Sequence, residues 1–227
     1  MTDAHDSFRP VPHIKGPADF RDAFAVPRET VEKLELYAAL LTRWQKAVNL
    51  VSPTTLSEVW HRHFADSAQL AGLASSPKSW VDLGSGAGFP GLVIAILMAN
   101  HDNCVVHLIE SNGRKCAFLA EVSRQTGVRV QIHEGRIENI VNSGAIGAAD
   151  VVSSRALAPL DRLFGLAHGF FGSGTSGLFL KGREASTEVD EASAQWRFDH
   201  RTVPSRTNAD GCIVEVRDLT AQGEFSR

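Results

Sequence analysis

The stretch from Trp80 to Gly91, W-V-D-L-G-S-G-A-G-F-P-G, constrains the fold of this 227-residue chain more than any other. It opens with mostly apolar residues that predict a strand, and four glycines follow, Gly84, Gly86, Gly88 and Gly91. Glycines allow a tight turn and let a ligand lie against bare backbone. Pro90 suits the first turn of a helix that continues to Leu97. The stretch predicts a strand, a ligand-binding loop and a helix.

Two classes of cofactor bind to a loop of this kind. The segment 86–91 satisfies the G-x-G-x-x-G pattern of dinucleotide sites. The carboxylate of Asp82, just before the first glycine, would repel a pyrophosphate but attract the cationic ammonium and sulfonium of S-adenosyl-L-methionine. Glu110 ends the next apolar segment, where a carboxylate can accept the hydroxyls of a ribose. These residues favour S-adenosyl-L-methionine, and an NAD-dependent oxidoreductase is the less favoured alternative.

Strand-like and helix-like segments alternate through the rest of the chain. Strands are predicted at residues 80–83, 104–109, 128–133, 150–153, 177–182, 197–203 and 212–216, and helices at 90–97, 112–127, 160–167 and 188–196. The last two strands flank a turn and predict an antiparallel hairpin. The pattern predicts an α/β fold with a doubly wound, mostly parallel, seven-stranded Rossmann-like methyltransferase sheet, a C-terminal antiparallel hairpin and an N-terminal helical extension.

Helical periodicity also precedes the central strand. Apolar residues recur at helical spacing from Val31 to Val48. Thr55 and Glu58 have the spacing of a capping box, which predicts a second helix running to about Leu73. We therefore expect a loose tail at residues 1–25, a helical extension at 26–76 and an S-adenosylmethionine-binding methyltransferase domain at 77–227.

Composition narrows the class of function. The 23 Lys and Arg residues against 26 Asp and Glu give a net charge of −3, which does not indicate general affinity for nucleic acid. The three cysteines form no C-x-x-C pair, which speaks against a zinc site and for a reducing compartment. We find no apolar core of the signal-peptide type and no apolar run long enough to span a membrane. We expect a cytoplasmic protein without a bound metal.

Polar side chains gather at two further places. His63, Asp66 and Ser67 are spaced so that they share one face of the predicted helix. A buried histidine satisfied by Asp66 and a polar cluster facing a cleft both fit this spacing. Arg155 and Lys181 end two neighbouring predicted strands, at the rim where an α/β sheet binds its ligands.

The rim segment S-S-R-A at residues 153–156 bears on the atom that is methylated. It is not the N-P-P-Y type of segment that holds an exocyclic amine, and no Pro-Cys pair is present for attack on a pyrimidine ring. Guanine N7 needs no activation, because its lone pair lies open in the plane of the base. Guanine N7 is therefore the favoured nucleophile.

From about Leu34 to Val216 the chain resembles the glucose-inhibited division protein B family. The likeness rests on L-T-R-W-Q-K-A-V-N-L, R-H-F-A-D-S, V-D-L-G-S-G-A-G-F-P-G, L-I-E-S-N-G-R-K-C-A-F-L, the segment around Gly135-Arg136, S-R-A and L-K-G. Members are bacterial methyltransferases that modify guanine N7 in a loop of 16S ribosomal RNA. The resemblance implies this activity, with S-adenosyl-L-methionine as cofactor and 16S ribosomal RNA or the small ribosomal subunit as partner.

The resemblance also implies roles for single residues. With those chosen above, the candidate cofactor-binding residues are Asp82, Gly84, Gly86, Gly88, Phe89, Glu110, Ile137, Glu138 and Arg155. The candidate catalytic residues, on the substrate side, are His63, Asp66, Ser67, Arg155 and Lys181.

Three positions depart from the family pattern. Gln45 and Val51 stand where the family shows Asn and Thr, and 172–177 replaces a shorter Pro-Gly-Gly turn. These departures affect RNA contact rather than cofactor binding. We expect a monomer, and a regulator that binds S-adenosylmethionine without catalysis is the second alternative.

Overall fold

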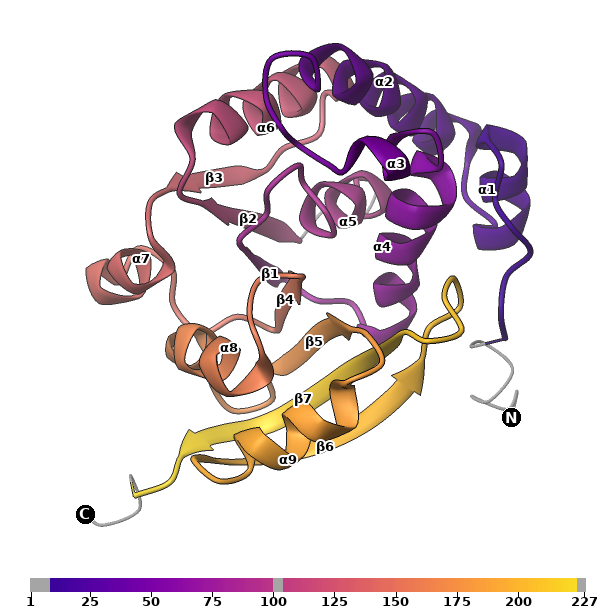
Figure 1. Cartoon of the computed structure of the whole chain (residues 1–227). Helices are drawn as coiled ribbons and strands as arrows, with labels where there is room; N and C mark the ends of the chain where they lie inside the picture. The colour runs from indigo at the N-terminus through magenta and orange to yellow at the C-terminus, as the bar shows by residue number, and fades with distance from the viewer. Residues whose placement is uncertain (1–8, 100–103, 224–227) are drawn as a thin grey trace.

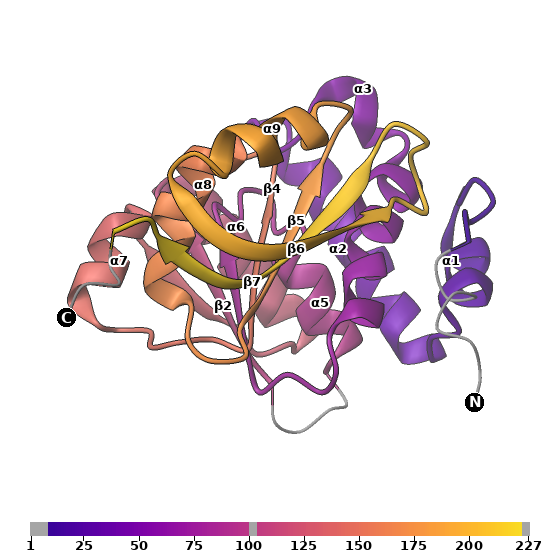
Figure 2. The same cartoon turned by 90° about the horizontal axis from the view of Figure 1, so that it is seen from below.

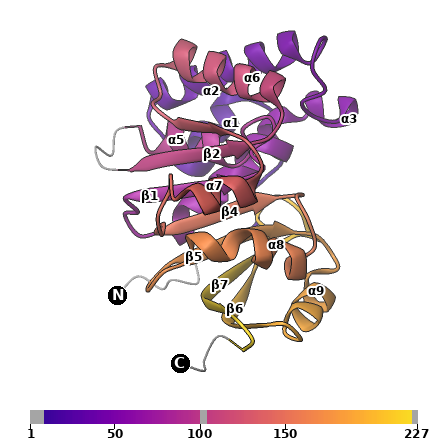
Figure 3. The same ribbon diagram turned by 90° about the vertical axis from the view of Figure 1, so that its left-hand side faces the viewer.

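A seven-stranded sheet organises the computed structural model, which describes residues 9–99 and 104–223 (Figure 1). The strands lie in the order β3-β2-β1-β4-β5-β7-β6, and Figure 3 shows them following one another across the molecule. The strands are β1 (Ser79–Leu83), β2 (Val105–Glu110), β3 (Gln131–Glu134), β4 (Val151–Arg155), β5 (Ser176–Lys181), β6 (Trp196–Pro204) and β7 (Cys212–Ala221). The first five are parallel, and β7 is antiparallel to both β5 and β6. The predicted fold class is confirmed.

Helices cover both faces of the sheet. The helices are α1 (Pro17–Phe24), α2 (Arg28–Trp44), α3 (Pro53–Leu56), α4 (Asp66–Ala68), α5 (Gly91–Leu97), α6 (Gly113–Thr126), α7 (Ile137–Ser143), α8 (Leu160–Ala167) and α9 (Ala185–Ala192). Figure 2 shows α8 and α9 on one side of the sheet and α2 and α5 on the other. Two apolar clusters follow this division, one with residues of α2, α5 and α6 and one with residues of α7, α8 and α9.

Local sequence signals explain where the elements of the sheet begin and end. The β1 residues Trp80, Val81 and Leu83 are fully buried, as expected of a central parallel strand covered on both faces. The side chain of Asn112 accepts hydrogen bonds from two backbone N–H groups at the start of α6, and Gly127 ends that helix with a left-handed φ of 67°. Both ends of α6 were predicted from the sequence.

The N-terminal segment differs from the prediction of a loose tail. Residues 17–24 form helix α1, and the Phe20 side chain is fully buried. Its ring lies 4.7 Å from that of Phe24 and 5.7 Å from that of Trp60, between ring centroids. The prediction is therefore wrong for this part, because Ile14 and Phe20 are buried in the apolar core and Phe24 packs against it. Residues 1–8 lie outside the described residues.

The predicted helix from Thr55 to Leu73 is instead four short elements. Helix α3 is followed by a π-helical turn (Trp60–Ala65), by α4 and by a 3₁₀ helix (Gln69–Leu73). Thr55 does not cap a helix: its hydroxyl donates to the carbonyl of Ser52, and Pro53 begins α3. The π-helical turn changes which side chains share a face, so a regular 3.6-residue period misplaces them.

Candidate active site

The carboxyl ends of the parallel strands meet at one edge of the sheet, and three cavities open there. The glycine-loop cavity has a volume of about 370 Å³, within the range of small-molecule sites. Its walls come from the loop after β1 and the ends of β2, β3 and β4, and they include Gly84, Gly86, Glu110, Lys115, Gly135, Ile137, Glu138 and residues 155–158. Six of the nine predicted cofactor-binding residues therefore line this cavity: Gly84, Gly86, Glu110, Ile137, Glu138 and Arg155.

The glycine loop is held open by its neighbours. Gly84 and Gly86 adopt left-handed φ angles of 66° and 58°. The N–H of Gly86 donates to Glu110 Oε2 at 2.8 Å, while the N–H of Asn112 donates to Glu110 Oε1 at 2.8 Å. Behind the loop, the hydroxyl of the buried Tyr37 donates to the carbonyl of Ala87. Glu110 thus ties the loop to β2 while its carboxylate stays at the cavity wall.

Asp82 does not line this cavity. Its carboxylate is 1% exposed and accepts from the Ser153 hydroxyl at 2.9 Å and from the N–H of Gly91 at 3.2 Å. Burial raises the pKa of Asp82 to about 6, although these hydrogen bonds act in the opposite direction. The predicted direct contact between Asp82 and a cationic cofactor is therefore wrong, and Asp82 instead joins β1 to β4 and to the start of α5.

Gly88 and Phe89 also lie behind the loop and not on the cavity. A Cβ at Gly88 would meet the side chains of Tyr37 and Leu92. The ring of Phe89 is 4% exposed and stacks on those of Tyr37 and His63, with centroids 5.4 and 4.7 Å away. These two predicted contacts are replaced by packing that fixes the shape of the loop.

The remaining residues fit S-adenosylmethionine. The loop offers bare backbone at Gly84 and Gly86, Glu110 offers carboxylate oxygens for ribose hydroxyls, and Ile137 offers an apolar side chain for the adenine face. Glu138 supplies a second carboxylate at that end. These groups match the nucleoside part of such a ligand.

Arg155 connects this cavity to the helical segment 60–68. One guanidinium nitrogen, Nη1, donates to the carbonyl of Arg62 at 3.0 Å and lies 3.3 Å from Asp66 Oδ2. The other, Nη2, donates to His63 Nδ1 at 2.9 Å, and the guanidinium carbon lies 5.0 Å from the centre of the Phe89 ring. Arg155 and Asp66 each keep 19% exposure of the side chain. The guanidinium is thus fixed in one orientation by four neighbours.

His63 is held neutral in this cluster. Burial, and secondarily the charge of Arg155, lower its pKa to about 3. Its Nε2 lies 3.0 Å from the Thr55 hydroxyl, so both ring nitrogens are engaged. The partner of His63 is therefore Arg155 rather than Asp66, which corrects the buried-histidine interpretation. Ser67 is fully buried, has no hydrogen-bond partner among the described residues and does not line the three cavities, so its predicted place on the substrate side is wrong.

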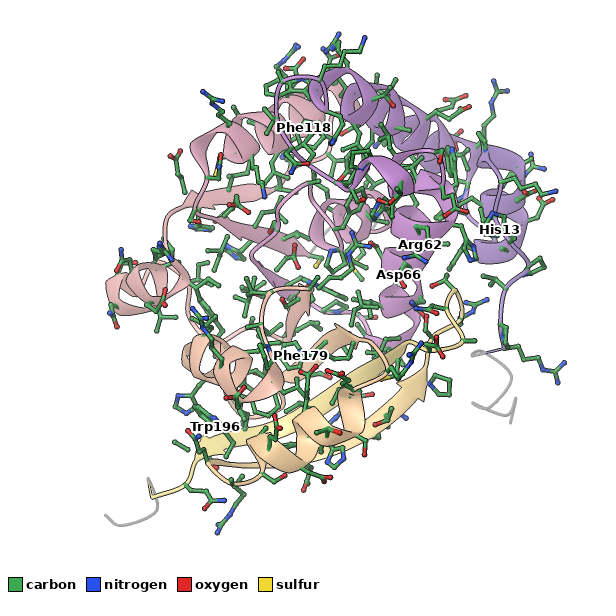
Figure 4. The ribbon with its side chains drawn as sticks, in the orientation of Figure 1. His13, Arg62, Asp66, Phe118, Phe179 and Trp196 are labelled. Carbon is green, nitrogen blue, oxygen red and sulfur yellow. The ribbon has the colours of Figure 1, made fainter. Side chains whose placement is uncertain are left out.

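Two more cavities flank Arg155. The β5 cavity has a volume of about 430 Å³ and lies between the ends of β4 and β5, helix α9 and the loop between β6 and β7. Its lining includes residues 155–159, Asp66, Lys181, Glu188, Asn208 and Cys212. The α3 cavity, of about 370 Å³, is lined by Val51, Ser52, Thr55, Arg62, His63, Asp66, Arg155 and Asn208, among others. Figure 4 labels Arg62 and Asp66 on the helical segment beside the tip of the β6–β7 hairpin.

Lys181 ends β5 and Arg155 ends the neighbouring strand β4, as predicted, and Arg155 pairs with Leu180 in the register of the two strands. Its ammonium donates to Glu188 Oε2 and to the carbonyl of Ala158, both at 2.6 Å, and its side chain is 9% exposed. Lys181 therefore holds a carboxylate at the wall of the β5 cavity and is not a free cation.

Several residues of the site were missed from the sequence. Thr207 donates to Asp66 Oδ1 at 2.8 Å from the distant β6–β7 loop, and Gln69 donates to the same oxygen at 3.1 Å. No local pattern links positions 141 residues apart, so only the hairpin in its folded place reveals Thr207. Gln45 accepts from the N–H groups of Leu50 and Val51, which shapes the loop that borders the α3 cavity.

Comparison with known proteins identifies the family. The family model of rRNA small subunit methyltransferase G matches residues 30–212. The chain belongs to this family. Ribosomal RNA small subunit methyltransferase G of Methylorubrum extorquens is 49% identical over 195 residues, covering 86% of this chain and 92% of the relative. The protein of that name from Parvibaculum lavamentivorans is 48% identical over 209 residues, covering 92% of each chain. The predicted family, methyltransferase activity and cofactor, S-adenosylmethionine, are confirmed.

Solved structures support the fold independently. The SAH-bound Podospora anserina methyltransferase PaMTH1 is 19% identical, with a TM-score of 0.54, and the match covers 85% of this chain and 88% of the PaMTH1 chain. The O-methyltransferase TomG from Streptomyces achromogenes is 15% identical, with a TM-score of 0.56, and the match covers 82% of this chain and 89% of the TomG chain. At these identities the likeness concerns the fold alone.

No group of three or more His, Cys, Asp or Glu side chains in residues 9–99 and 104–223 is placed to hold a metal ion. In the same part of the chain, no helix has the length and apolar character needed to cross a membrane.

Proposed function

We propose that this methyltransferase transfers the methyl group of S-adenosylmethionine to N7 of a guanine in 16S ribosomal RNA of the small subunit. The observation that carries the proposal is the shared wall at residues 155–158, which lines both the glycine-loop cavity and the β5 cavity. A cofactor in the first cavity and a base in the second would both contact residues 155–158, which would bring the methyl group and the base to the same part of the sheet edge. The proposal includes the predicted monomer and cytoplasmic location.

The bound cofactor would supply an electrophilic methyl group, and the chain would supply position and charge. Guanine N7 carries no proton, so no side chain has to act as a base. His63 fits this mechanism, because a pKa of about 3 makes it too weak a base to take up a proton at neutral pH and both of its nitrogens are occupied. Asp66, which lines the β5 cavity together with Arg155, would stabilise the positive charge that develops on the purine.

RNA binding would depend on a local basic surface, since the net charge of the chain is −3. The candidates with exposed side chains are Arg43, Lys46, Arg62 and Arg114, and Lys115 borders the glycine-loop cavity. Arg62 lines the α3 cavity beside the Ser52 hydroxyl, and a guanidinium next to a hydroxyl suits a phosphate. Lys181 is paired with Glu188 and is less suited to direct phosphate contact.

The test is methylation of small ribosomal subunits with labelled S-adenosylmethionine, followed by mass spectrometric mapping of the modified base. We expect one methyl group on N7 of one guanine. Methyl groups on another atom would contradict the proposal. Cofactor binding with no transfer to subunits or to naked 16S RNA would instead support the non-catalytic regulator.

A further inference from the structure

The β5 cavity carries a feature that the proposed transfer to N7 does not use. Two carboxylates line it: Asp66, which is paired with Arg155, and Glu188, which is paired with Lys181. The wall also includes the apolar side chains of Leu157, Pro159 and Leu180. A planar base fits such a cavity, because its faces are apolar and its edges are polar.

The two carboxylates differ in what they can still accept. Both oxygens of Asp66 are used, Oδ1 by Thr207 and Gln69 and Oδ2 by Arg155. In Glu188, Oε2 accepts from Lys181 at 2.6 Å and from the N–H of Leu160 at 2.8 Å, whereas Oε1 has no hydrogen-bond partner among the described residues. The Glu188 side chain is 20% exposed. Glu188 is therefore fixed through one oxygen and presents the other to the cavity.

Guanine has a complementary edge. Its N1–H and its 2-amino group are adjacent donors on the side of the base away from N7, so a base with N7 at the cofactor wall presents these donors to the rest of the cavity. The free oxygen of Glu188, Oε1, has two lone pairs and can accept from both donors, whereas adenine has an acceptor at N1 and no 2-amino group. Positive charge that develops at N7 makes the N1–H a stronger donor, so this contact also strengthens in the transition state.

The α3 cavity is less suited to the base. The His63 ring nitrogens are both engaged and its face is stacked on Phe89, so it offers no free group for reading an edge. The Thr55 hydroxyl is also engaged, since it donates to the carbonyl of Ser52. What remains there is the exposed Arg62 and the Ser52 hydroxyl, which suit the sugar-phosphate backbone.

We propose that the β5 cavity receives the target guanine and that Glu188 selects it by accepting hydrogen bonds from N1–H and the 2-amino group. This inference rests on the proposed function. Lys181 acts as a positioning residue, because it holds Glu188 through Oε2. The contact to the backbone N–H of Leu160 fixes the same carboxylate from α8.

The test compares single-turnover methylation of subunits reconstituted with guanosine or with inosine at the target position, since inosine keeps N7 and N1–H and lacks only the 2-amino group. The wild-type enzyme should favour guanosine roughly 10- to 100-fold, the value of one hydrogen bond to a charged acceptor. In Glu188→Gln the ratio should fall to about 3-fold or less, because the amide is a weaker acceptor and keeps the shape. Glu191→Gln, on the exposed last turn of α9, is the matched control and should keep the wild-type ratio.

A structural role for Glu188 would lower both rates equally and leave the ratio unchanged, and that result would overturn the inference. Calorimetric binding of S-adenosylmethionine by Glu188→Gln verifies that the variant is folded. If Glu188→Gln is not folded, Lys181→Met gives a second test. Without Lys181 the Glu188 carboxylate is no longer held in place, so the guanosine-to-inosine rate ratio should again fall. An unchanged ratio in Lys181→Met counts equally against the inference. Absence of any guanosine methylation by the wild-type enzyme would refute the proposed function itself, so the two failures are distinguishable.

Discussion

Replacing Arg155 by Met removes the guanidinium that connects β4 to the helical segment 60–68, while the aliphatic part of the side chain stays. The variant loses hydrogen bonds to the Arg62 carbonyl and to His63, the ion pair with Asp66, and the contact with the Phe89 ring. Each is worth about 1 kcal/mol or less at a site with this exposure. We expect a loss of about 2 to 3 kcal/mol in the free energy of unfolding, because Asp66 keeps its bonds to Thr207 and Gln69.

Urea unfolding without cofactor measures this loss, and a double-mutant cycle with Asp66→Asn separates the ion pair from the rest. Coupling of about 1 kcal/mol is expected, whereas the exposed pair Arg28–Glu32 should show none. The pKa of His63, followed by NMR, should rise from about 3 in Arg155→Met, because the charge of Arg155 lowers it, and should stay below 6.5 because burial remains. A destabilisation below about 0.5 kcal/mol with no coupling would refute this account of the cluster.

Three further predictions test the loop, the buried carboxylate and the chemistry. Gly86→Val should abolish the binding of S-adenosylmethionine measured by calorimetry. The control is Gly144→Val, because Gly144 has a similar left-handed φ of 64° and a Cβ there would meet no other atom; this variant should strain the backbone equally but still bind S-adenosylmethionine. Binding of S-adenosylmethionine by Gly86→Val would contradict the proposed cofactor site. Burial raises the pKa of Asp82 from 3.8 to about 6, so its stabilisation is complete below pH 3.8 and is lost as the pH rises through 6. As the pH rises from 4 to 8, the free energy of unfolding of Asp82→Asn, measured in urea, should therefore rise by up to about 3 kcal/mol relative to that of the wild type. If the two free energies changed with pH in parallel, the pKa of Asp82 would not be raised. Single-turnover methylation should be nearly flat from about pH 6.5 to 9, and Asp66→Asn should lower its rate by about 10- to 100-fold without a new slope; a log-linear rise with pH would show that a base is required.

The arrangement of the sheet followed from local patterns. Glycines after β1, the capping Asn112 and the Gly127 terminus of α6 are signals carried by a few adjacent residues, and each matched the structure. Residues whose backbone or carboxylate lines the glycine-loop cavity, such as Gly86 and Glu110, could be found in the same way, because the ends of parallel strands meet at one edge.

The prediction failed where the outcome depended on which way a side chain turns or on distant contacts. Asp82 occupies the expected position, but its carboxylate turns toward Ser153 and Gly91. The π-helical turn before α4 removed Ser67 from the substrate side, and helical periodicity alone cannot indicate such a turn. Glu188 gains its place from Lys181 and Leu160, which only the packing of α8 and α9 against β5 brings together.

The central claim is transfer to guanine N7 without a general base, and substitution of that single atom tests it most directly. Small subunits reconstituted with 7-deazaguanosine at the target position keep the N1–H and 2-amino edge but carry carbon in place of N7. We predict that such subunits bind the enzyme as well as unmodified ones in a competition assay and accept no detectable methyl group in a single turnover. Transfer at an unchanged rate would contradict the account, because the methyl group would then go to another atom.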